Sequence, residues 1–349
     1  MSRAPFFAVD RRCWRAACDL GMNEAVAYLV IASGTGGDQR TSSWSATSIE
    51  VRTGIHHRRA TGAIDNLVGA GLMTVEKRGK RRSYFLKPAN EVPAVVAKTI
   101  TPARRAREKC QEALEELENP QWIWLPNALV EGAADETPPV KLLRQSQNLK
   151  ALRLFIDLYF YHDLADCGGI EWHRGIGIRQ PFTRREIGRH GIYVVWAFKP
   201  DPTTGSQTYK NAPFWFEGGF WDAWNMLLSA GLVEFVAHLV ESDGDVAEVI
   251  HPLPWANGED GEKAITIAAI GAGRRMAPFF DDERTTMLIP VSKLRPDVEL
   301  IGIARMKYRP QTARTSEWLA KANEWRKTAL AFDEMAATVE DSGIKVVSR

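Results

Sequence analysis

Cationic side chains are concentrated in one short part of the sequence, where their types and spacing suit the binding of phosphate groups. The 40 residues from Val51 to Asn90 contain nine Lys or Arg and two acids. Arginine offers a planar fork of donors that fits phosphate oxygens and guanine edges. Hydroxyl groups near helix ends can also contact phosphate. The residues that carry this chemistry are Ser45, Thr53, His56, His57, Arg58, Arg59, Thr61, Lys77, Arg78, Lys80, Arg81 and Arg82.

Two short helices joined by a tight turn must position the first of these residues. Ser45 is suited to cap a helix over Ala46–Thr53, Gly54 to make the turn and Ile55 to enter the core. A second helix is expected from His56 to about Ala70, because its apolar residues recur at the helical period. Those apolar residues are Ala60, Ala63, Ile64, Leu67 and Val68, and the opposite face presents His57, Arg58, Arg59, Thr61 and Gly62.

A β-hairpin is expected to follow the second helix and to carry the remaining cations. Gly71 is suited to cap the helix, Leu72–Glu76 and Ser83–Leu86 read as the two strands, and Lys77–Arg82 forms the basic tip. Lys87 and Pro88 then close the module. This order places the cations at the start of one helix and at the tip of one hairpin.

A helix, a glycine turn, a second helix and a basic hairpin resemble a winged helix-turn-helix, over residues 22–88, about a fifth of the chain. The unit also includes an earlier helix, which is expected at Glu24–Ala32 with Asn23 as its cap. The resemblance implies that the helix from His56 enters the major groove of duplex DNA. It also implies that the hairpin neutralises phosphates or enters the minor groove. Gly62, which costs roughly 1 kcal/mol against alanine in a helix, allows close approach to DNA or is simply tolerated.

Composition fits a folded protein with a polyanion partner at its N-terminal end. The 349 residues are 45% hydrophobic and 25% charged. Residues 1–100 hold 15 Lys or Arg and 8 Asp or Glu, a net charge of +7, so that the remainder carries −5. No apolar run reaches membrane-spanning length and no signal peptide is evident, so a cytoplasmic location without membrane contact is expected. The four cysteines lack zinc or disulfide spacing and are interpreted as buried thiols.

Residues 91–136 are interpreted as a linker that contains a helix at Ala103–Glu118, preceded by an extended segment over Val92–Thr101. Beyond it, Leu149–Leu164 has the pattern of an apolar helix. Thr183–Glu186 fits a capping box and predicts a short helix, and Ile192–Phe198 predicts a buried strand.

An internal similarity suggests a second domain over residues 137–255. Ala63–Leu72 and Ala223–Leu232 both read as a helix ending in Ala-Gly-Leu that leads into a hairpin, the second hairpin over Leu232–Ile250. The pattern fits a degenerate second winged helix, or only a common helix–hairpin connection. Asn211–Glu262 contains ten acids and no Lys or Arg, so the phosphates of DNA would repel this copy and it is poorly suited to bind DNA. Its aromatic cluster suits a core, a protein partner or self-association as a dimer, and the only basic set nearby is Arg179, Arg184, Arg185, Arg189 and His190.

The remaining residues, 256–349, are expected to form strands at Ala264–Ile270 and Met287–Pro290 and a final helix over about Ser316–Val339. The predicted class is therefore α+β. It consists of an N-terminal winged helix-turn-helix over residues 1–90, the linker, a degenerate winged-helix-like domain and a C-terminal helix.

Catalytic and metal chemistry have little support in the sequence. A group of possible ligands falls within twelve residues but fits no zinc pattern, and no phosphate loop, nucleophile elbow or dinucleotide fingerprint occurs. We therefore expect a non-enzymatic protein without cofactor or metal that binds double-stranded DNA sequence-specifically, as a transcriptional regulator. The alternatives are a plasmid or phage replication initiator and a docking subunit of a larger defence or mobile-element complex. The possible ligands are His162, Asp163, Asp166, Cys167, Glu171 and His173.

Overall fold

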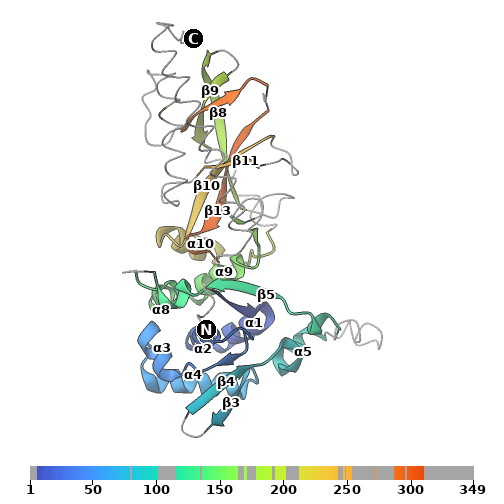
Figure 1. Ribbon diagram of the computed structural model, residues 1–349, viewed down its shortest axis with the longest axis vertical. Coiled ribbons are helices and arrows are strands. Elements are labelled where there is room, and N and C mark those ends of the chain that lie inside the picture. Colours follow the sequence, from blue (N-terminus) through green and yellow to red (C-terminus); the bar gives the residue numbers. More distant parts are fainter. Residues whose placement is uncertain are drawn as a thin grey trace. The chain divides into compact units, whose positions relative to one another are not determined.

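The protein combines helices and strands in two compact units, which Figure 1 shows as a ribbon of the computed structural model. The first unit comprises Met1–Phe160, Gly218–Leu232 and Tyr308–Gln311, and the second comprises Tyr161–Glu217, Val233–Lys307 and Thr312–Arg349. The α+β class expected from the sequence is confirmed. The structure describes residues 6–78, 81–100, 115–133, 136–163, 169–170, 178–190, 193–201, 212–242, 247, 249–253, 271, 287–294 and 297–309.

The first unit is mainly helical and holds most of the elements that were expected near the cations. The helix expected over Ala46–Thr53 is confirmed, and the next one runs from His57 to Gly69. Its elements are β1 (Phe6–Asp10), α1 (Arg11–Leu20), α2 (Met22–Ser33), β2 (Thr41–Ser42), α3 (Ala46–Thr53), α4 (His57–Gly69), β3 (Met73–Arg78), β4 (Arg81–Leu86), the 3-10 turn η1 (Ala89–Glu91), α5 (Pro93–Thr99), β5 (Trp122–Pro126), α7 (Ala128–Glu131), α8 (Pro139–Gln145), α9 (Leu149–Leu158) and α10 (Phe220–Ser229).

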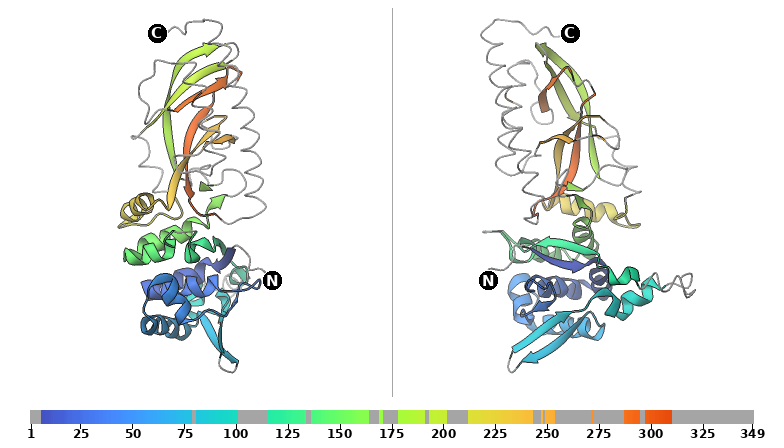
Figure 2. Two further views of the ribbon diagram at one scale, coloured as in Figure 1. Left: turned by 60° about the vertical axis from the view of Figure 1, so that its left-hand side comes forward. Right: turned by 45° about the vertical axis from the view of Figure 1, so that its right-hand side comes forward.

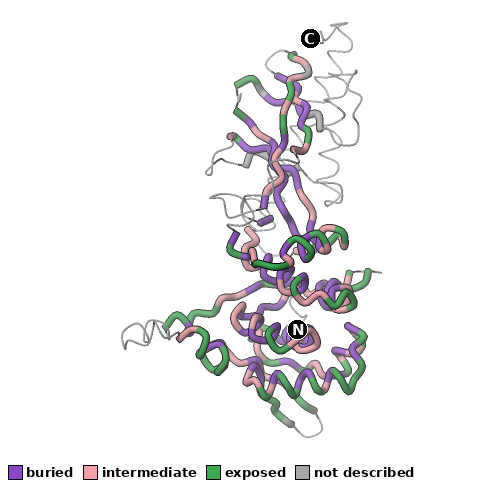
Figure 3. Tube along the Cα trace, turned by 180° about the vertical axis from the view of Figure 1, so that it is seen from behind, coloured by how far each residue is buried: buried purple, intermediate pink, exposed green. Residues whose placement is uncertain are grey.

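Helix α2 is the centre of this unit. Every residue from Ala25 to Ser33 is buried, and α2 packs against α1, α3, α4 and α8. A helix that is apolar on all sides must be covered on all sides, which explains why neighbouring helices surround it. Helix α4 instead buries only one face, so its other face remains exposed, as the green segments of the tube show (Figure 3). The first unit therefore holds α4 firmly and leaves half of its surface free.

Two small sheets complete the first unit. Strands β2, β4 and β3 form an antiparallel sheet in that order, and the β3–β4 hairpin extends from the helices (Figure 2). Strands β1 and β5 form an antiparallel ribbon in which Phe6 pairs with Pro126 and Asp10 with Trp122. The segment 91–136, expected to be a linker, thus supplies a strand to the N-terminal unit.

Two local expectations in the segment 91–136 have different outcomes. Val92–Thr101 was expected to be extended because of its prolines, but Pro93–Thr99 is the helix α5. Proline is tolerated at the first helical position, where its missing N–H has no partner to lose, and this accounts for the difference. Most of the helix expected over Ala103–Glu118 lies outside the described residues. The part that is described, residues 115–118, is helical.

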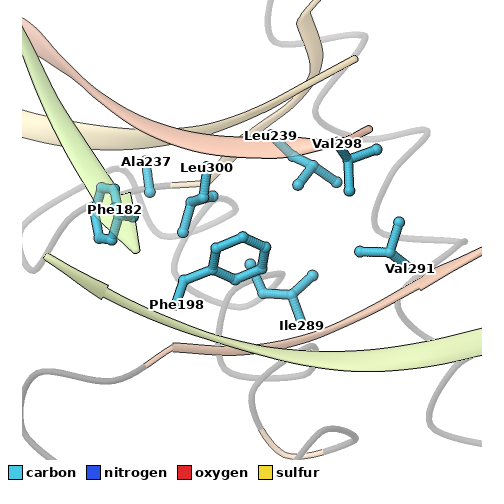
Figure 4. Packing of buried hydrophobic residues seen from close by; sticks show 8 residues of the cluster. All are labelled: Phe182, Phe198, Ala237, Leu239, Ile289, Val291, Val298 and Leu300. Atoms are coloured by element: carbon cyan, nitrogen blue, oxygen red, sulfur yellow. The ribbon is translucent and has the colours of Figure 1, made fainter. Parts of the chain in front are cut away.

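The second unit is built on a curled six-stranded sheet in the order β11-β10-β13-β8-β9-β12. One end of the long strand β8 pairs with β13 and the rest pairs with β9, so the sheet bends around its own apolar face. Phe182, Phe198 and Leu300 meet on that face with residues of β10 and β12 (Figure 4). Its strands are β6 (His162–Asp163), β7 (Gly169–Ile170), β8 (Arg179–His190), β9 (Tyr193–Pro200), β10 (Val233–Val240), β11 (Val249–Leu253), β12 (Met287–Ser292) and β13 (Glu299–Met306).

The sequence-based prediction of a helix beginning at Thr183–Glu186 is wrong, because these residues belong to β8. Burial of Phe182 in the sheet core and pairing with β9 outweigh a four-residue capping pattern that also tolerates an extended chain. The strand near Ile192–Phe198, the hairpin near Leu232–Ile250 and the strand at Met287–Pro290 are confirmed as β9, β10–β11 and β12. The segments 264–270 and 316–339 lie outside the described residues.

Residues 137–255 do not correspond to one compact unit. Helix α10, the counterpart of α4 in the internal similarity, packs against α9 in the first unit. Strand β10, which follows it, lies between β11 and β13 in the second unit. The shared Ala-Gly-Leu pattern therefore marks a common helix–strand connection, in which Gly71 and Gly231 both have positive φ.

Candidate nucleic-acid interface

A rigid turn joins α3 to α4 and fixes where α4 begins. Gly54 has φ of 71°, a left-handed conformation that glycine adopts without strain, and its N–H donates to the Glu50 carbonyl at 2.8 Å. Ile55 follows it and is fully buried. Both residues thus have the roles expected from the sequence.

Thr53, a candidate contact in the sequence-based prediction, is buried in the turn between α3 and α4. Its side chain is only 1% exposed. The hydroxyl donates to the Ile49 carbonyl at 2.6 Å and accepts the Ile55 N–H at 3.2 Å. Because both functions of the hydroxyl are used inside the turn, Thr53 stabilises the α3–α4 connection and is removed from the candidate contacts.

Two side chains cap the N-terminus of α4. His56 accepts the Arg58 N–H through Nδ1 at 3.3 Å, and a carboxylate oxygen of Glu50 accepts the His57 N–H at 3.1 Å. The first N–H groups of a helix have no partner within it, so both contacts stabilise α4. His56 is exposed but its imidazole serves the cap, whereas Glu50 is a member of this site that the sequence did not indicate.

The first turn of α4 exposes its cations. His57, Arg58 and Arg59 are all exposed, and neither arginine forms an ion pair within the described part of the chain. Positive charge at a helix N-terminus opposes the helix dipole by about 0.3–1 kcal/mol per residue. The fold therefore gains nothing electrostatically from these two arginines.

Beyond its first turn, the exposed face of α4 carries Gly62, Asp65, Asn66 and Gly69, with Thr61 at its edge. Thr61 is half-buried and its hydroxyl donates to the His57 carbonyl at 3.0 Å. Gly62 and Gly69 lie seven residues apart, and a Cβ added at either would meet no atom within 4 Å. Packing inside the protein thus does not require glycine at Gly62, which leaves close approach of a ligand or simple tolerance as explanations.

The backbone register of the β3–β4 hairpin pairs basic residues with one another. Its register pairs Lys77 with Arg82 and Arg78 with Arg81. Like charges directly opposite on two strands are destabilising unless a counter-charge is bound. Arg82 is exposed, and Lys80 lies outside the described residues. Tyr84 and Leu86 are buried and anchor the base of the hairpin, whereas the side chains of Lys77, Arg78 and Arg81 are not among those described.

Ser45 lies at the N-cap of α3, as expected. Its N–H donates to the Ser48 hydroxyl at 3.3 Å, one half of a reciprocal cap. Arg52 stacks over the ring of Trp44, with its guanidinium carbon 3.6 Å from the ring centroid. Trp44 also occupies the space above Gly34, where a Cβ would come within 2.3 Å of the indole. Arg52 is therefore part of the packing at the start of α3.

Two of the basic residues that the sequence placed in the second unit, Arg184 and Arg189, are neutralised within it. Arg184 lies 3.6 Å from the Glu299 carboxylate, stacks over Trp196 and donates to the Val298 carbonyl. Arg189 pairs with Glu186. Arg185 is exposed, whereas the side chain of His190 is not among those described. These contacts make β8 a weak candidate for phosphate binding.

Other expectations concern cysteine and metal chemistry. Cys13 and Cys18 are buried, and burial raises the pKa of the Cys13 thiol to about 12, so it is not a reactive thiolate. Within the described ranges no group of three His, Cys, Asp or Glu could hold a metal ion. Of the six possible ligands, only His162 and Asp163 are described. No helix in the described ranges is both long and apolar enough to cross a membrane.

Comparisons with known proteins do not add a family to this description. No family model matches the chain, and neither a curated protein nor a solved structure is significantly similar to it.

Proposed function

We propose that the chain binds duplex DNA through residues 22–88, acting as a winged helix-turn-helix with α4 as the reading helix and β3–β4 as the wing. One observation carries the proposal: Arg58 and Arg59 are exposed on the first turn of α4 without an acidic partner among the described residues. Their cost to the helix is offset when they meet phosphates or guanine edges.

The dimensions of α4 support this role. Thirteen residues make a helix of about 20 Å, and the major groove, about 12 Å wide, admits a single helix. Thr61 and Gly62 follow Arg58 along α4, so the part that enters the groove first carries donors and then the short side chain of Thr61 beside a glycine. Strand β3 packs against α4, which places the cations of the hairpin on the same unit.

The biological role that we propose is transcriptional regulation without enzymatic activity. In this proposal the second unit binds a protein partner or mediates self-association. The acidic composition of Asn211–Glu262 and the internal ion pairs of Arg184 and Arg189 favour a protein over a second DNA contact. The DNA sites recovered by selection with the purified chain test this role, because palindromes indicate a dimeric regulator and direct repeats indicate an initiator.

The salt dependence of binding tests the DNA proposal directly. Affinity for random duplex should fall steeply with salt concentration, because bound cations release counterions from the phosphates. Replacing Lys80, Arg81 and Arg82 with alanine should reduce the logarithmic salt slope by up to about three. The control is Lys98→Ala, which removes an exposed lysine paired with Asp19 and should leave the slope unchanged. A flat salt response of the wild-type chain would overturn the proposal.

A further inference from the structure

The outer face of the β1–β5 ribbon carries a group of aromatic rings that the DNA proposal does not use. Ile123 and Leu125 of β5 are buried, so the alternate residues Trp122 and Trp124 lie on the other face. Trp124 is 42% exposed. Its ring centroid is 5.3 Å from that of Phe6 in an edge-to-face contact and 6.4 Å from that of Trp122. The ribbon lies in the first unit, where β5 is labelled in Figure 1.

A cavity of about 50 Å³ adjoins this aromatic face, and Trp122 belongs to both. This volume is several times the minimum of about 10–15 Å³ that holds one water molecule, so a small polar group fits. Leu86–Ala89, at the base of the β3–β4 hairpin, form one wall, and Ala8–Asp10 form another. Gln39 also lines the cavity and accepts the Ala8 N–H at 2.8 Å.

Two cations of the cavity lining form no ion pair within the described part of the chain. Arg40 and Lys87 are half-buried, and neither forms an ion pair with any residue that the structure describes. Of the two acids in the lining, Asp10 is already held by Arg12 at 2.7 Å, and Glu118 is exposed. Half-buried cations without a carboxylate partner favour an anionic ligand.

We propose that this surface binds an unpaired nucleic-acid strand, with bases stacked on Trp124 and Trp122 and phosphates held by Arg40 and Lys87. Aromatic rings beside cations are the combination that binds single strands, because every base has a π-face and every linkage carries a charge. The site goes beyond the proposed duplex recognition and uses neither the cations of α4 nor those at the tip of the hairpin. It lies at the base of the hairpin whose far end carries the phosphate-binding cations proposed above.

A single strand fits this face better than a peptide does. The outer positions of the ribbon hold Phe6, Trp122 and Trp124, and the remaining ones are the buried Ala8, Pro126 and Asp10, the last of which is paired with Arg12. Aromatic rings alone also suit a protein partner, but the half-buried Arg40 and Lys87 beside them favour a ligand that carries a negative charge on every unit. A duplex is excluded as the ligand of this face because its bases are already stacked on one another.

The test compares a ten-nucleotide single strand of mixed sequence with a blunt duplex, both fluorescently labelled, bound by the full-length chain. Trp124→Ala should weaken binding of the single strand by about five- to 150-fold, the usual effect of losing one stacked base, and leave duplex binding unchanged. The control is Trp221→Ala, because Trp221 on α10 is 39% exposed, close to the value for Trp124. It should affect neither probe.

A double variant keeps the proposal testable if Trp124→Ala disturbs the folding of the ribbon. Arg40→Gln with Lys87→Gln keeps the aromatic face and should lower the salt slope for the single strand only. Equal single-strand binding by Trp124→Ala and Trp221→Ala overturns the proposal. Competition by a mononucleotide as effective as by the ten-nucleotide strand also overturns it, in favour of a free nucleotide. The proposal is also overturned, in favour of a protein interface, if the wild-type chain self-associates without binding the single strand and Trp124→Ala makes it monomeric.

Discussion

Glu50 accepts a hydrogen bond from the backbone N–H of His57 at 3.1 Å, so a carboxylate lies at the start of the helix that carries Arg58 and Arg59. This contact joins α3 to α4 and partly compensates two cations at a helix N-terminus. The same carboxylate would repel the phosphates that the arginines are proposed to bind. Stability of α4 and affinity for DNA therefore place opposite demands on Glu50.

Glu50→Gln separates these two demands. The amide keeps an acceptor for the His57 N–H but loses the charge, so the free energy of unfolding should fall by about 0.3–1 kcal/mol. Affinity for duplex should rise about fivefold, the equivalent of ~1 kcal/mol between unit charges 4 Å apart in water. Chemical denaturation and fluorescence anisotropy measure the two effects. Glu91→Gln, which removes an exposed charge in η1, should change neither, and unchanged affinity in Glu50→Gln would place the DNA elsewhere.

Gly62→Ala should make the protein more stable and the complex with DNA weaker. A Cβ at Gly62 meets no protein atom, so the helix should gain about 1 kcal/mol. If α4 approaches the groove closely at this position, the added methyl group should reduce duplex affinity about tenfold, since overpacking a fitted contact costs typically 1–3 kcal/mol. Gly69→Ala, two turns further along α4, is the matched control for stability. Unchanged affinity in Gly62→Ala would show that this glycine is merely tolerated.

Thr53→Val tests the reassignment of Thr53 from the interface to the turn. Valine has nearly the same shape but cannot accept the Ile55 N–H, and an unsatisfied buried donor costs about 1–3 kcal/mol. The free energy of unfolding should fall by this amount, whereas Thr53→Ser, which keeps the hydroxyl, should lose less. Duplex affinity measured well below the melting temperature should be unchanged in both variants. A loss of affinity in fully folded Thr53→Val would restore the sequence-based assignment.

The elements around the cations could be predicted from the sequence because their signals are local. The apolar period of Ala60 and Leu67, the glycine turn at Gly54 and the alternation that ends at Leu86 each lie within a few residues of the element they define. The exposure of Arg58 and Arg59 follows from the same period. Their positions on α4 were therefore predictable, whereas their freedom from acidic partners was not.

The remaining features depend on contacts between distant residues. The β1–β5 ribbon joins residues more than a hundred positions apart, and no local sequence pattern indicates that pairing. The residues of Thr183–Glu186 suit a helix cap, yet they pair with β9 as part of a strand. Thr53 has the type of a surface hydroxyl, and only the closed turn shows that both of its hydrogen bonds are internal. Tertiary packing decided each of these cases against local preference.

Asp157 of α9 should be among the most sensitive positions of the first unit. It is buried and lies 2.9 Å from a guanidinium nitrogen of Arg15 and 3.5 Å from one of Arg11, both on α1. Removing one partner of a buried ion pair leaves an uncompensated charge and costs about 3–5 kcal/mol. Asp157→Ala should therefore lower the free energy of unfolding by about that amount in chemical denaturation.

The exposed ion pair between Asp19 and Lys98 provides the comparison for Asp157. It also starts from α1, but its side chains are 44% and 68% exposed. Solvent screens such pairs, so Asp19→Ala should cost at most about 1 kcal/mol. Double-mutant cycles for Asp157 with Arg15 and for Asp19 with Lys98 should give a coupling energy at least several times larger for the buried pair. Equal couplings would mean that α1 is held to α9 by apolar packing alone and that the acid at Asp157 is dispensable.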